Sequence, residues 1–179
     1  YQPSPDTDIS PQPRSDALLD VDGPLNPFAA KAHRRPPGYE TFRQTKSGGW
    51  YTSKRKGLRV WLNPRHGVLL RALAEETGLT LVWATSWQHE ANDYIGPVLG
   101  LPPLPVIEFT VRRDWKWPAV SDYAAGRPLA WFDDQFNRGQ QNFEAERDGT
   151  PTLLCHVDPA SGLRDKHFQE VRAWAKRLP

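Results

Sequence analysis

Three pairs of oxygen-bearing side chains each follow a short apolar segment of this chain. The pairs are Asp20 and Asp22, Thr85 and Ser86, and Asp133 and Asp134. Carboxylates that gather in one place repel one another unless a hard cation lies among them, and Mg²⁺ takes oxygen ligands while keeping water in its shell. With hydroxyl groups and a lysine, such a cluster can bind a phosphoryl group and stabilise its charge. The residue types therefore predict Mg²⁺-dependent phosphate chemistry.

Each pair also has a purely structural interpretation. A single Asp-x-Asp is usually a turn or a cap, and Asp133-Asp134 can begin the helix that follows. Thr-Ser at the end of a strand commonly makes a turn, and one lysine such as Lys116 is commonly solvated. Three such strand ends in one chain are much less frequent by chance than any one of them, so we interpret them together as an active site.

The apolar segments before the pairs are predicted strands of a parallel sheet. Strands are expected at residues 17–19, 79–84, 106–109, 129–132 and 152–157. Helices are expected from Asn63-Pro64 to Gly78 and at residues 90–99, 116–125, 136–147 and 165–177. This alternation predicts an α/β fold with helices on both faces of the sheet. Ligands of such sheets bind beyond the carboxyl ends of the strands, where all three pairs lie.

Residues 24–62 lack helical periodicity. Two strand-like segments, 39–45 and 50–61, flank Ser47-Gly48-Gly49, which is a plausible hairpin turn. We interpret residues 24–62 as a β-hairpin flap inserted between the first strand and the first core helix. Residues 1–15 are proline-rich and are predicted to be a flexible tail, with one domain over residues 16–179.

The charge of the chain is concentrated near this insertion. From residue 31 to residue 65 there are ten Lys or Arg and one acid, a net +9, whereas the whole chain carries only +2. Basic side chains contact phosphates and aromatic rings stack on bases, which favours a nucleotide or an RNA or DNA end as the phosphorylated substrate. The alternative is that the aromatic residues only pack the hairpin and the lysines are solvated. The predicted substrate contacts are Trp50, Lys54, Arg55, Lys56 and Arg59.

The remaining composition restricts the class of protein. Cys155 is the only cysteine, so neither an intramolecular disulfide nor a cysteine zinc site is possible. No run of about 18 apolar residues exists, which excludes a membrane-spanning helix. We expect a cytoplasmic protein, and nothing in the sequence indicates its oligomeric state.

The order of the motifs resembles that of the haloacid dehalogenase (HAD) superfamily. Its four motifs are similar to residues 17–23, residues 82–86, Lys116 and residues 129–134. More narrowly, the chain resembles the HAD domain of Swiss-army-knife RNA-repair proteins. That likeness rests on residues 20–27, 60–64, 83–87, 101–105, 116–118 and 131–134. The resemblance implies a HAD-like Rossmannoid sheet with a small cap at the insertion.

The resemblance also implies a mechanism. Asp20 would attack phosphorus and form an aspartyl-phosphate. Asp22 would protonate the leaving oxygen and then deprotonate the water that hydrolyses the intermediate. This second carboxylate favours a phosphatase over a dehalogenase. The alternative function is a catalytically idle HAD module that binds RNA or a protein partner.

The remaining motif residues are assigned to the ligands by the same resemblance. Mg²⁺ would be bound by Asp20, by the main-chain carbonyl of Asp22, and by Asp133 or Asp134. The non-bridging phosphate oxygens would be bound by Thr85, or less favourably Ser86, and by Lys116. Arg112 and Arg113 are alternatives to Lys116 as phosphate ligands.

Overall fold

A four-stranded parallel sheet forms the centre of the molecule in the computed structural model, which describes residues 14–52, 55–110, 115–136 and 138–179. Its strands are β1 (Asp16–Leu19), β4 (Thr80–Trp83), β5 (Leu129–Asp133) and β6 (Thr152–His156). They lie in the order β4-β1-β5-β6, so β1 is flanked by β4 and β5. The predicted α/β fold with a parallel sheet is confirmed.

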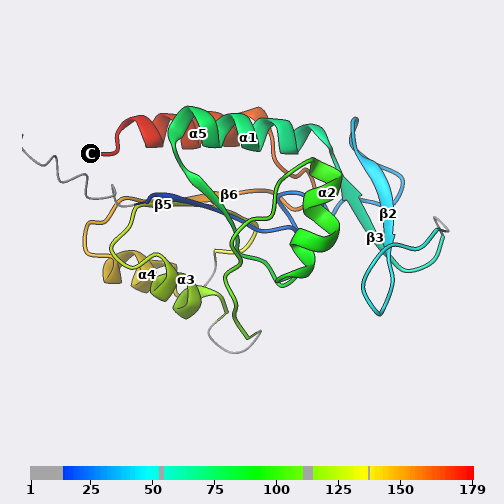
Figure 1. Ribbon diagram of the computed structural model, residues 1–179, viewed down its shortest axis with the longest axis horizontal. Coiled ribbons are helices and arrows are strands. Elements are labelled where there is room, and N and C mark those ends of the chain that lie inside the picture. The colour runs from blue at the N-terminus through cyan, green and yellow to red at the C-terminus, as the bar shows by residue number, and fades with distance from the viewer. Residues whose placement is uncertain (1–13, 53–54, 111–114, 137) are drawn as a thin grey trace, which may run out of the picture.

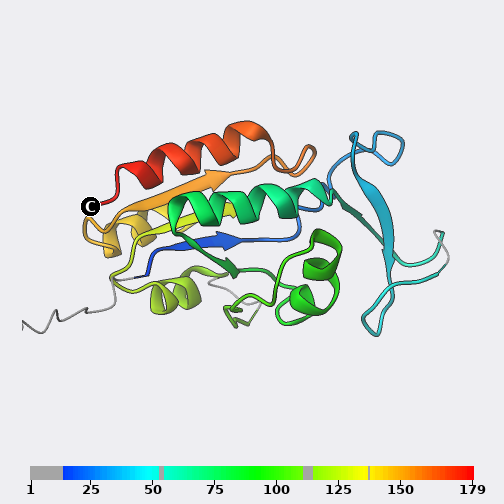
Figure 2. The same ribbon diagram turned by 45° about the horizontal axis from the view of Figure 1, so that its top comes forward.

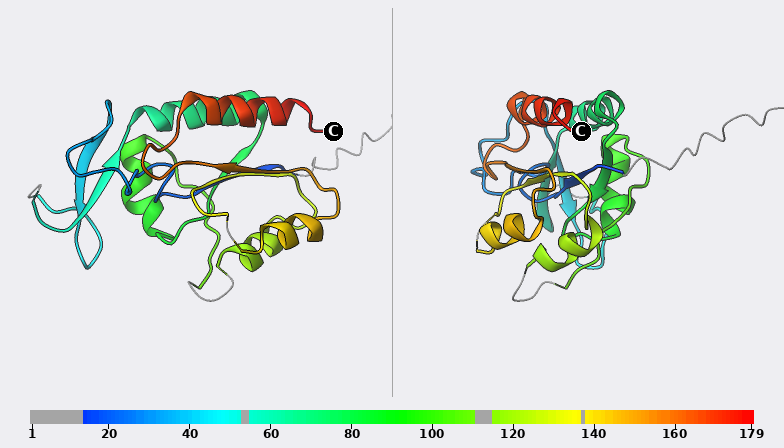
Figure 3. Two further views of the ribbon diagram at one scale, coloured as in Figure 1. Left: turned by 180° about the vertical axis from the view of Figure 1, so that it is seen from behind. Right: turned by 90° about the vertical axis from the view of Figure 1, so that its left-hand side faces the viewer.

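Helices cover both faces of this sheet. On one face lie α1 (Arg65–Thr77) and α5 (Asp165–Lys176), and on the other lie α3 (Trp117–Tyr123) and α4 (Gln140–Glu146) (Figure 1). The end-on view of Figure 3 shows the three layers directly. Two apolar clusters result, because successive strand residues point to opposite faces: Ala17 and Leu19 belong to one, and Leu18 to the other.

The predicted hairpin is formed by β2 (Glu40–Gln44) and β3 (Leu58–Leu62), which pair antiparallel between β1 and α1 in the chain. Figure 2 shows that the parallel strands point toward the end of the molecule where this hairpin lies. The insertion therefore stands beyond the carboxyl edge of the sheet. The π-helical segment η1 (Ala91–Ile95) and the short α2 (Gly96–Leu99) lie between that edge and the hairpin (Figure 1).

The predicted ends of α1 are confirmed by local hydrogen bonds. The Asn63 side-chain oxygen accepts a bond from the Arg65 backbone N–H at 3.0 Å. Gly78 ends the helix in the left-handed region, with φ of 74°, where a residue with a Cβ is disfavoured.

Three predicted elements differ from the structure. Residues 106–109 form no strand: Val106 makes one isolated parallel bridge to Trp83, the last residue of β4, so no ladder extends beyond it. The second hairpin strand begins at Leu58, because Trp50 pairs only with Gln44 across the turn. The helix predicted from residue 136 begins at Gln140, since Gly139 before it is left-handed, with φ of 101°.

Within the described ranges, no helix is both long enough and apolar enough to cross a membrane. Residues 1–13, most of the predicted tail, lie outside those ranges.

Candidate active site

The predicted pairs meet at the carboxyl ends of β1, β4 and β5. Asp20 follows β1, and its backbone N–H donates to the carbonyl of Phe132 in β5 at 3.1 Å. On the other side, the N–H of Ala84 donates to the carbonyl of Leu19 at 2.9 Å. The strand register thus brings together side chains that are up to 114 positions apart in the sequence. They border a cavity of about 220 Å³, lined by Asp20, Asp22, Phe28, Ser86, Phe109, Trp115, Lys116, Asp133, Asp134 and Gln135.

Three carboxylates of this cavity form a cluster suited to a metal ion. Asp20, Asp133 and Asp134 each present an oxygen, and these oxygens lie within 4.8 Å of one another. Asp20 and Asp133 are buried and Asp134 is half-buried. An all-oxygen set of this kind suits a hard divalent cation. The carboxylate of Asp22 does not belong to this cluster.

Lys116 links two members of the cluster. Its Nζ lies 2.6 Å from Oδ2 of Asp133 and 3.2 Å from Oδ2 of Asp20, and its side chain is buried. Burial lowers the pKa of Lys116, but the two carboxylates outweigh it and the net pKa is raised. A permanent positive charge therefore lies inside the site, where it can bind an anionic oxygen.

The pKa values of the two buried carboxyl groups, Asp20 and Asp133, are also raised, which favours their neutral forms. Burial raises the pKa of Asp20 to about 8; the charge of Lys116 opposes that rise, and the neighbouring charges of Asp133 and Asp22 add to it. Burial also raises the pKa of Asp133 to about 6, again against the effect of Lys116. One ammonium group thus does not offset the cost of burying these charges, and both pKa values stay above the ordinary value of an aspartic acid. A divalent cation would restore the balance, so the residues present fit a bound metal.

The two hydroxyl residues lie at different depths. Thr85 is buried, hydrogen-bonds to Asp20, and accepts a bond from the Trp87 backbone N–H at 3.3 Å. Ser86 is exposed and lines the cavity. Thr85 thus orients the carboxylate, whereas Ser86 faces the space that a ligand would occupy.

This geometry agrees with one comparison to known proteins. The family model described as "HAD domain in Swiss Army Knife RNA repair proteins" matches residues 17–168, from β1 into α5. The chain belongs to this family. It is therefore a HAD-type domain, from a superfamily of hydrolases that typically use a metal ion. No protein with a curated description and no solved structure matches it.

The second aspartate of the HAD domain is held separately from the cluster. Oδ1 of Asp22 accepts a bond from the Asn26 side-chain amide at 3.0 Å, and Oδ2 accepts one from the Trp87 indole N–H at 3.2 Å. Neither donor was singled out as a site residue from the sequence. Both lie within the motif segments 20–27 and 83–87, so their closeness to the acidic and hydroxyl pairs was the available signal.

Gly23 is required by close packing in the HAD domain. Its φ is 105°, and a Cβ built on it would lie 2.7 Å from both Cβ and Cγ of Asp134. The backbone after the first motif thus fits directly against a carboxylate of the cluster.

The predicted substrate contacts in the insertion are partly occupied by internal interactions. Trp50 packs against Phe42, Trp87 and Tyr94, with ring centroids 5.1, 6.2 and 6.1 Å away. The Arg59 guanidinium lies 3.7 Å above the Trp61 ring and donates to the carbonyls of Phe28 and Ala30. These two residues therefore match the packing alternative.

The other predicted phosphate and substrate contacts differ in what the structure describes. Arg55 and Lys56 are exposed, while Lys54, Arg112 and Arg113 lie outside the described residues.

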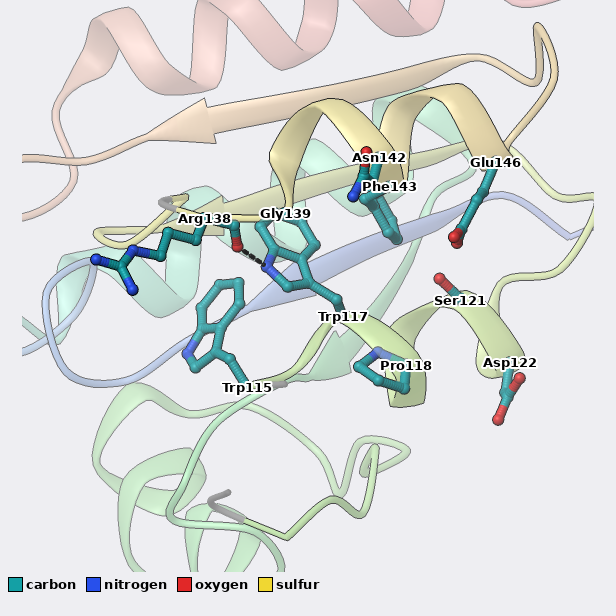
Figure 4. Close-up of a pocket in the computed structure, with 10 residues that line it drawn as sticks. All are labelled: Trp115, Trp117, Pro118, Ser121, Asp122, Arg138, Gly139, Asn142, Phe143 and Glu146. Atoms are coloured by element: carbon teal, nitrogen blue, oxygen red, sulfur yellow. Dashed lines mark hydrogen bonds between the residues drawn. The ribbon is translucent and has the colours of Figure 1, made fainter. Parts of the chain in front are cut away.

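A larger hollow, of about 760 Å³, lies between α3 and α4 of the HAD domain (Figure 4). Its floor includes Trp117 and Phe143, and Asp122 and Glu146 lie at one end (Figure 4). Trp115 also lines the smaller cavity, so the two spaces share one wall. None of the predicted catalytic or metal-binding residues lines the hollow. The hollow is larger than the cavity, but the carboxylates of the cluster and Lys116 line only the smaller cavity, so we place the candidate active site there.

Proposed function

We propose that this HAD domain is a Mg²⁺-dependent phosphohydrolase that cleaves phosphomonoesters through an aspartyl-phosphate at Asp20. The observation that carries the proposal is the cluster of Asp20, Asp133 and Asp134, whose oxygens lie within 4.8 Å of one another. Lys116 bridges the two buried members, Asp20 and Asp133. Asp22, outside the cluster yet lining the same cavity, supplies a second carboxylate for proton transfer.

The two aspartates divide the reaction between them. Asp20 attacks phosphorus, the new bond joins its carboxylate oxygen to phosphorus, and the bond to the leaving oxygen breaks. Asp22 gives that oxygen a proton. Water then attacks the phosphoryl group while Asp22 takes the water's proton, which releases phosphate and restores Asp20.

The remaining residues bind the ion and the phosphate. Asp20, the main-chain carbonyl of Asp22, and Asp133 or Asp134 would hold Mg²⁺, which when bound neutralises charge around the phosphoryl group. Lys116 and Ser86 would bind non-bridging oxygens, with Thr85 fixing the orientation of Asp20.

For the substrate we propose a nucleotide or an RNA or DNA end. The matching family is described from RNA repair proteins, and the +9 segment belongs to the insertion beyond the sheet edge. A cavity of about 220 Å³ is smaller than the roughly 300–1,000 Å³ of pockets that enclose whole small molecules. It suits the phosphoryl group, so the remainder of the substrate would lie outside, against the lining residues Phe28, Phe109 and Trp115, which are all at least partly exposed.

The test is turnover of an aryl phosphate, followed by a panel of nucleotides and end-phosphorylated oligonucleotides. We expect activity that requires Mg²⁺ and is abolished by EDTA and by Asp20→Asn. Asp122→Asn is the matched control, because it makes the same change at an exposed position away from the carboxylate cluster.

Undiminished turnover in Asp20→Asn would remove the covalent mechanism. The idle-module alternative predicts no turnover on any member of the panel, together with oligonucleotide binding that survives Asp20→Asn.

A further inference from the structure

We propose that Asn26 and Trp87 are positioning residues that clamp the carboxylate of Asp22 in its acid/base position, and that the β2–β3 insertion braces this clamp. The inference rests on the proposed function, since it concerns the proton-transfer step at the same site. It gives the insertion a role in catalysis besides contact with substrate.

The clamp holds Asp22 from two sides. The Asn26 amide donates to Oδ1 at 3.0 Å and the Trp87 indole donates to Oδ2 at 3.2 Å. Asn26 is 1% exposed and Trp87 8%. Two donors on different oxygens fix both the position and the plane of the carboxylate. Each oxygen keeps a second lone pair, so proton exchange in the cavity stays possible.

The clamp keeps Asp22 apart from its acidic neighbours. Asp22 lines the same cavity as Asp20, Asp133 and Asp134, and a carboxylate free to rotate there would be attracted to any cation that the cluster binds. A carboxylate that ligates the cation with its oxygens is a poor proton carrier. Holding Asp22 by two neutral donors therefore preserves its availability for the leaving oxygen and for water.

Strand β3 braces Asn26. The backbone N–H of Trp61 donates to Oδ1 of Asn26 at 3.0 Å, so the side-chain oxygen is committed to β3 and the NH₂ group must face Asp22. The backbone of Asn26 is fixed as well, because its carbonyl accepts from Gly23 and its N–H donates to Val21, both at 2.8 Å. The donor that meets Asp22 is thus set by the insertion.

The aromatic residues of the insertion brace Trp87. Its ring packs against Trp50, which in turn packs against Phe42 of β2 and Tyr94 of η1. The Trp87 backbone N–H donates to the Thr85 hydroxyl, which fixes the backbone of Trp87 just after the end of β4. Trp50 therefore connects the hairpin to the acid/base residue through a single intervening ring.

The experiment measures how kcat/KM depends on the leaving group in Trp87→Phe and in Asn26→Asp. Trp87→Phe keeps an aromatic ring against Trp50 but removes the donor. Asn26→Asp keeps an acceptor for Trp61 but replaces the NH₂ group by an oxygen that repels Asp22.

Because kcat/KM covers the steps through departure of the leaving group, it isolates the acid role of Asp22 from the later hydrolysis. We expect a loss of roughly 10-fold or more for alkyl and phenyl phosphates, and little loss for 4-nitrophenyl phosphate, whose leaving group needs no proton.

The matched control is Trp83→Phe. It removes another indole donor, which bonds to Oδ1 of Asn92 at 2.8 Å, without touching Asp22. Its leaving-group dependence should equal that of the wild type even where its thermal stability falls. Trp87→Phe introduces no charge and keeps an aromatic ring, so it should disturb the fold less than Asn26→Asp. It is sufficient for the test if Asn26→Asp does not fold.

The outcomes separate the two proposals. An unchanged leaving-group dependence in folded Trp87→Phe overturns the clamp and leaves the phosphohydrolase proposal standing. A steeper dependence that Trp83→Phe shares also overturns it, because the effect would then be general loosening. Absence of turnover in folded, Mg²⁺-supplied wild type, or full turnover in Asp20→Asn, overturns the proposed function itself and the clamp role with it.

Discussion

At Gly23, the backbone of the first motif and the side chain of Asp134 occupy adjoining space with no room for a methyl group. A Cβ would lie 2.7 Å from Cβ and Cγ of Asp134, and the φ of 105° would also strain any other residue. Gly23→Ala should therefore displace Asp134 from the metal cluster. We expect Mg²⁺ affinity, measured by isothermal titration calorimetry, to fall roughly 10-fold or more.

The control for this prediction is Gly78→Ala. Gly78 has a similar left-handed backbone, with φ of 74°, but no atom lies within 4 Å of its would-be Cβ. That variant should lose about 1 kcal/mol of stability and keep its Mg²⁺ affinity. Equal Mg²⁺ affinities in the two variants would show that Asp134 is not a ligand or that it moves without cost.

Asp22→Asn separates the acid/base from the nucleophile. Because its carboxylate lies outside the cluster, the substitution should leave Mg²⁺ affinity largely intact while turnover falls by roughly 10²-fold or more. Calorimetry and steady-state kinetics on one preparation measure both. Loss of affinity with normal turnover would reverse the assigned roles.

At the level of single residues, the sequence predicted the reactive groups of the site but not the side chains that position them. Asp20 and Asp133 could be placed because each follows an apolar strand, and parallel strands end at one edge. The indole donor to Asp22 could not, because Trp87 is 65 positions away in the chain and an indole N–H has no sequence signature. Trp50 was predicted to contact substrate, yet the structure packs it against Trp87.

Among the elements, α1 carries a buried histidine that can report on stability. His66 is 4% exposed and lies edge-on to Tyr39, with ring centroids 5.6 Å apart. Burial lowers its pKa from 6.5 to about 4, and a hydrogen bond with the Leu163 backbone opposes the shift only in part. The folded protein thus favours the neutral ring, while the unfolded chain takes up the proton first.

The protein should therefore lose stability as the pH falls below the pKa of an ordinary histidine. The contribution of the neutral His66 ring to the free energy of unfolding is fully present above pH 6.5. It is lost as the pH falls toward about 4, to a total of roughly 3 kcal/mol. Urea unfolding of the wild type and of His66→Gln between pH 4 and pH 7 measures it. Other titrating groups are common to both proteins and cancel in the difference. Free energies that stay parallel throughout this range would contradict the prediction.

Element boundaries were predictable where local chemistry decides them. Asn63 and Gly78 enclose α1 because a side-chain oxygen and a left-handed residue act within one turn of the helix ends. Residues 106–109 were apolar enough for a strand, but only Val106 pairs, since pairing depends on a neighbour that the sequence does not specify. Likewise, strand order in the sheet depends on packing across the whole chain and not on any one apolar run.

On the scale of the whole molecule, the basic segment and the chain's C-terminus lie at opposite ends (Figure 1). The segment from residue 31 to residue 65 carries +9, so the remainder carries −7 of the total of +2. Arg59 is bound internally, but Lys46 and Lys56 are exposed on the insertion. A polyanion that reaches the catalytic cavity from outside would therefore meet positive charge at this end first.

The double variant Lys46→Ser/Lys56→Ser tests whether the exposed lysines of the insertion contact the substrate. If both lysines contact a single-stranded substrate, the slope of log affinity against log salt should shrink by roughly 0.7 for each lost contact. KM should rise for end-phosphorylated oligonucleotides, whereas kcat for a small aryl phosphate should stay constant, because that substrate reaches only the cavity. Lys176→Ser/Arg177→Ser removes the same charge from exposed residues at the far end and should change neither quantity. Equal slopes in the two double variants would mean that the lysines of the insertion are only solvated, and that nucleic acid, if it is the substrate, is bound elsewhere on the domain.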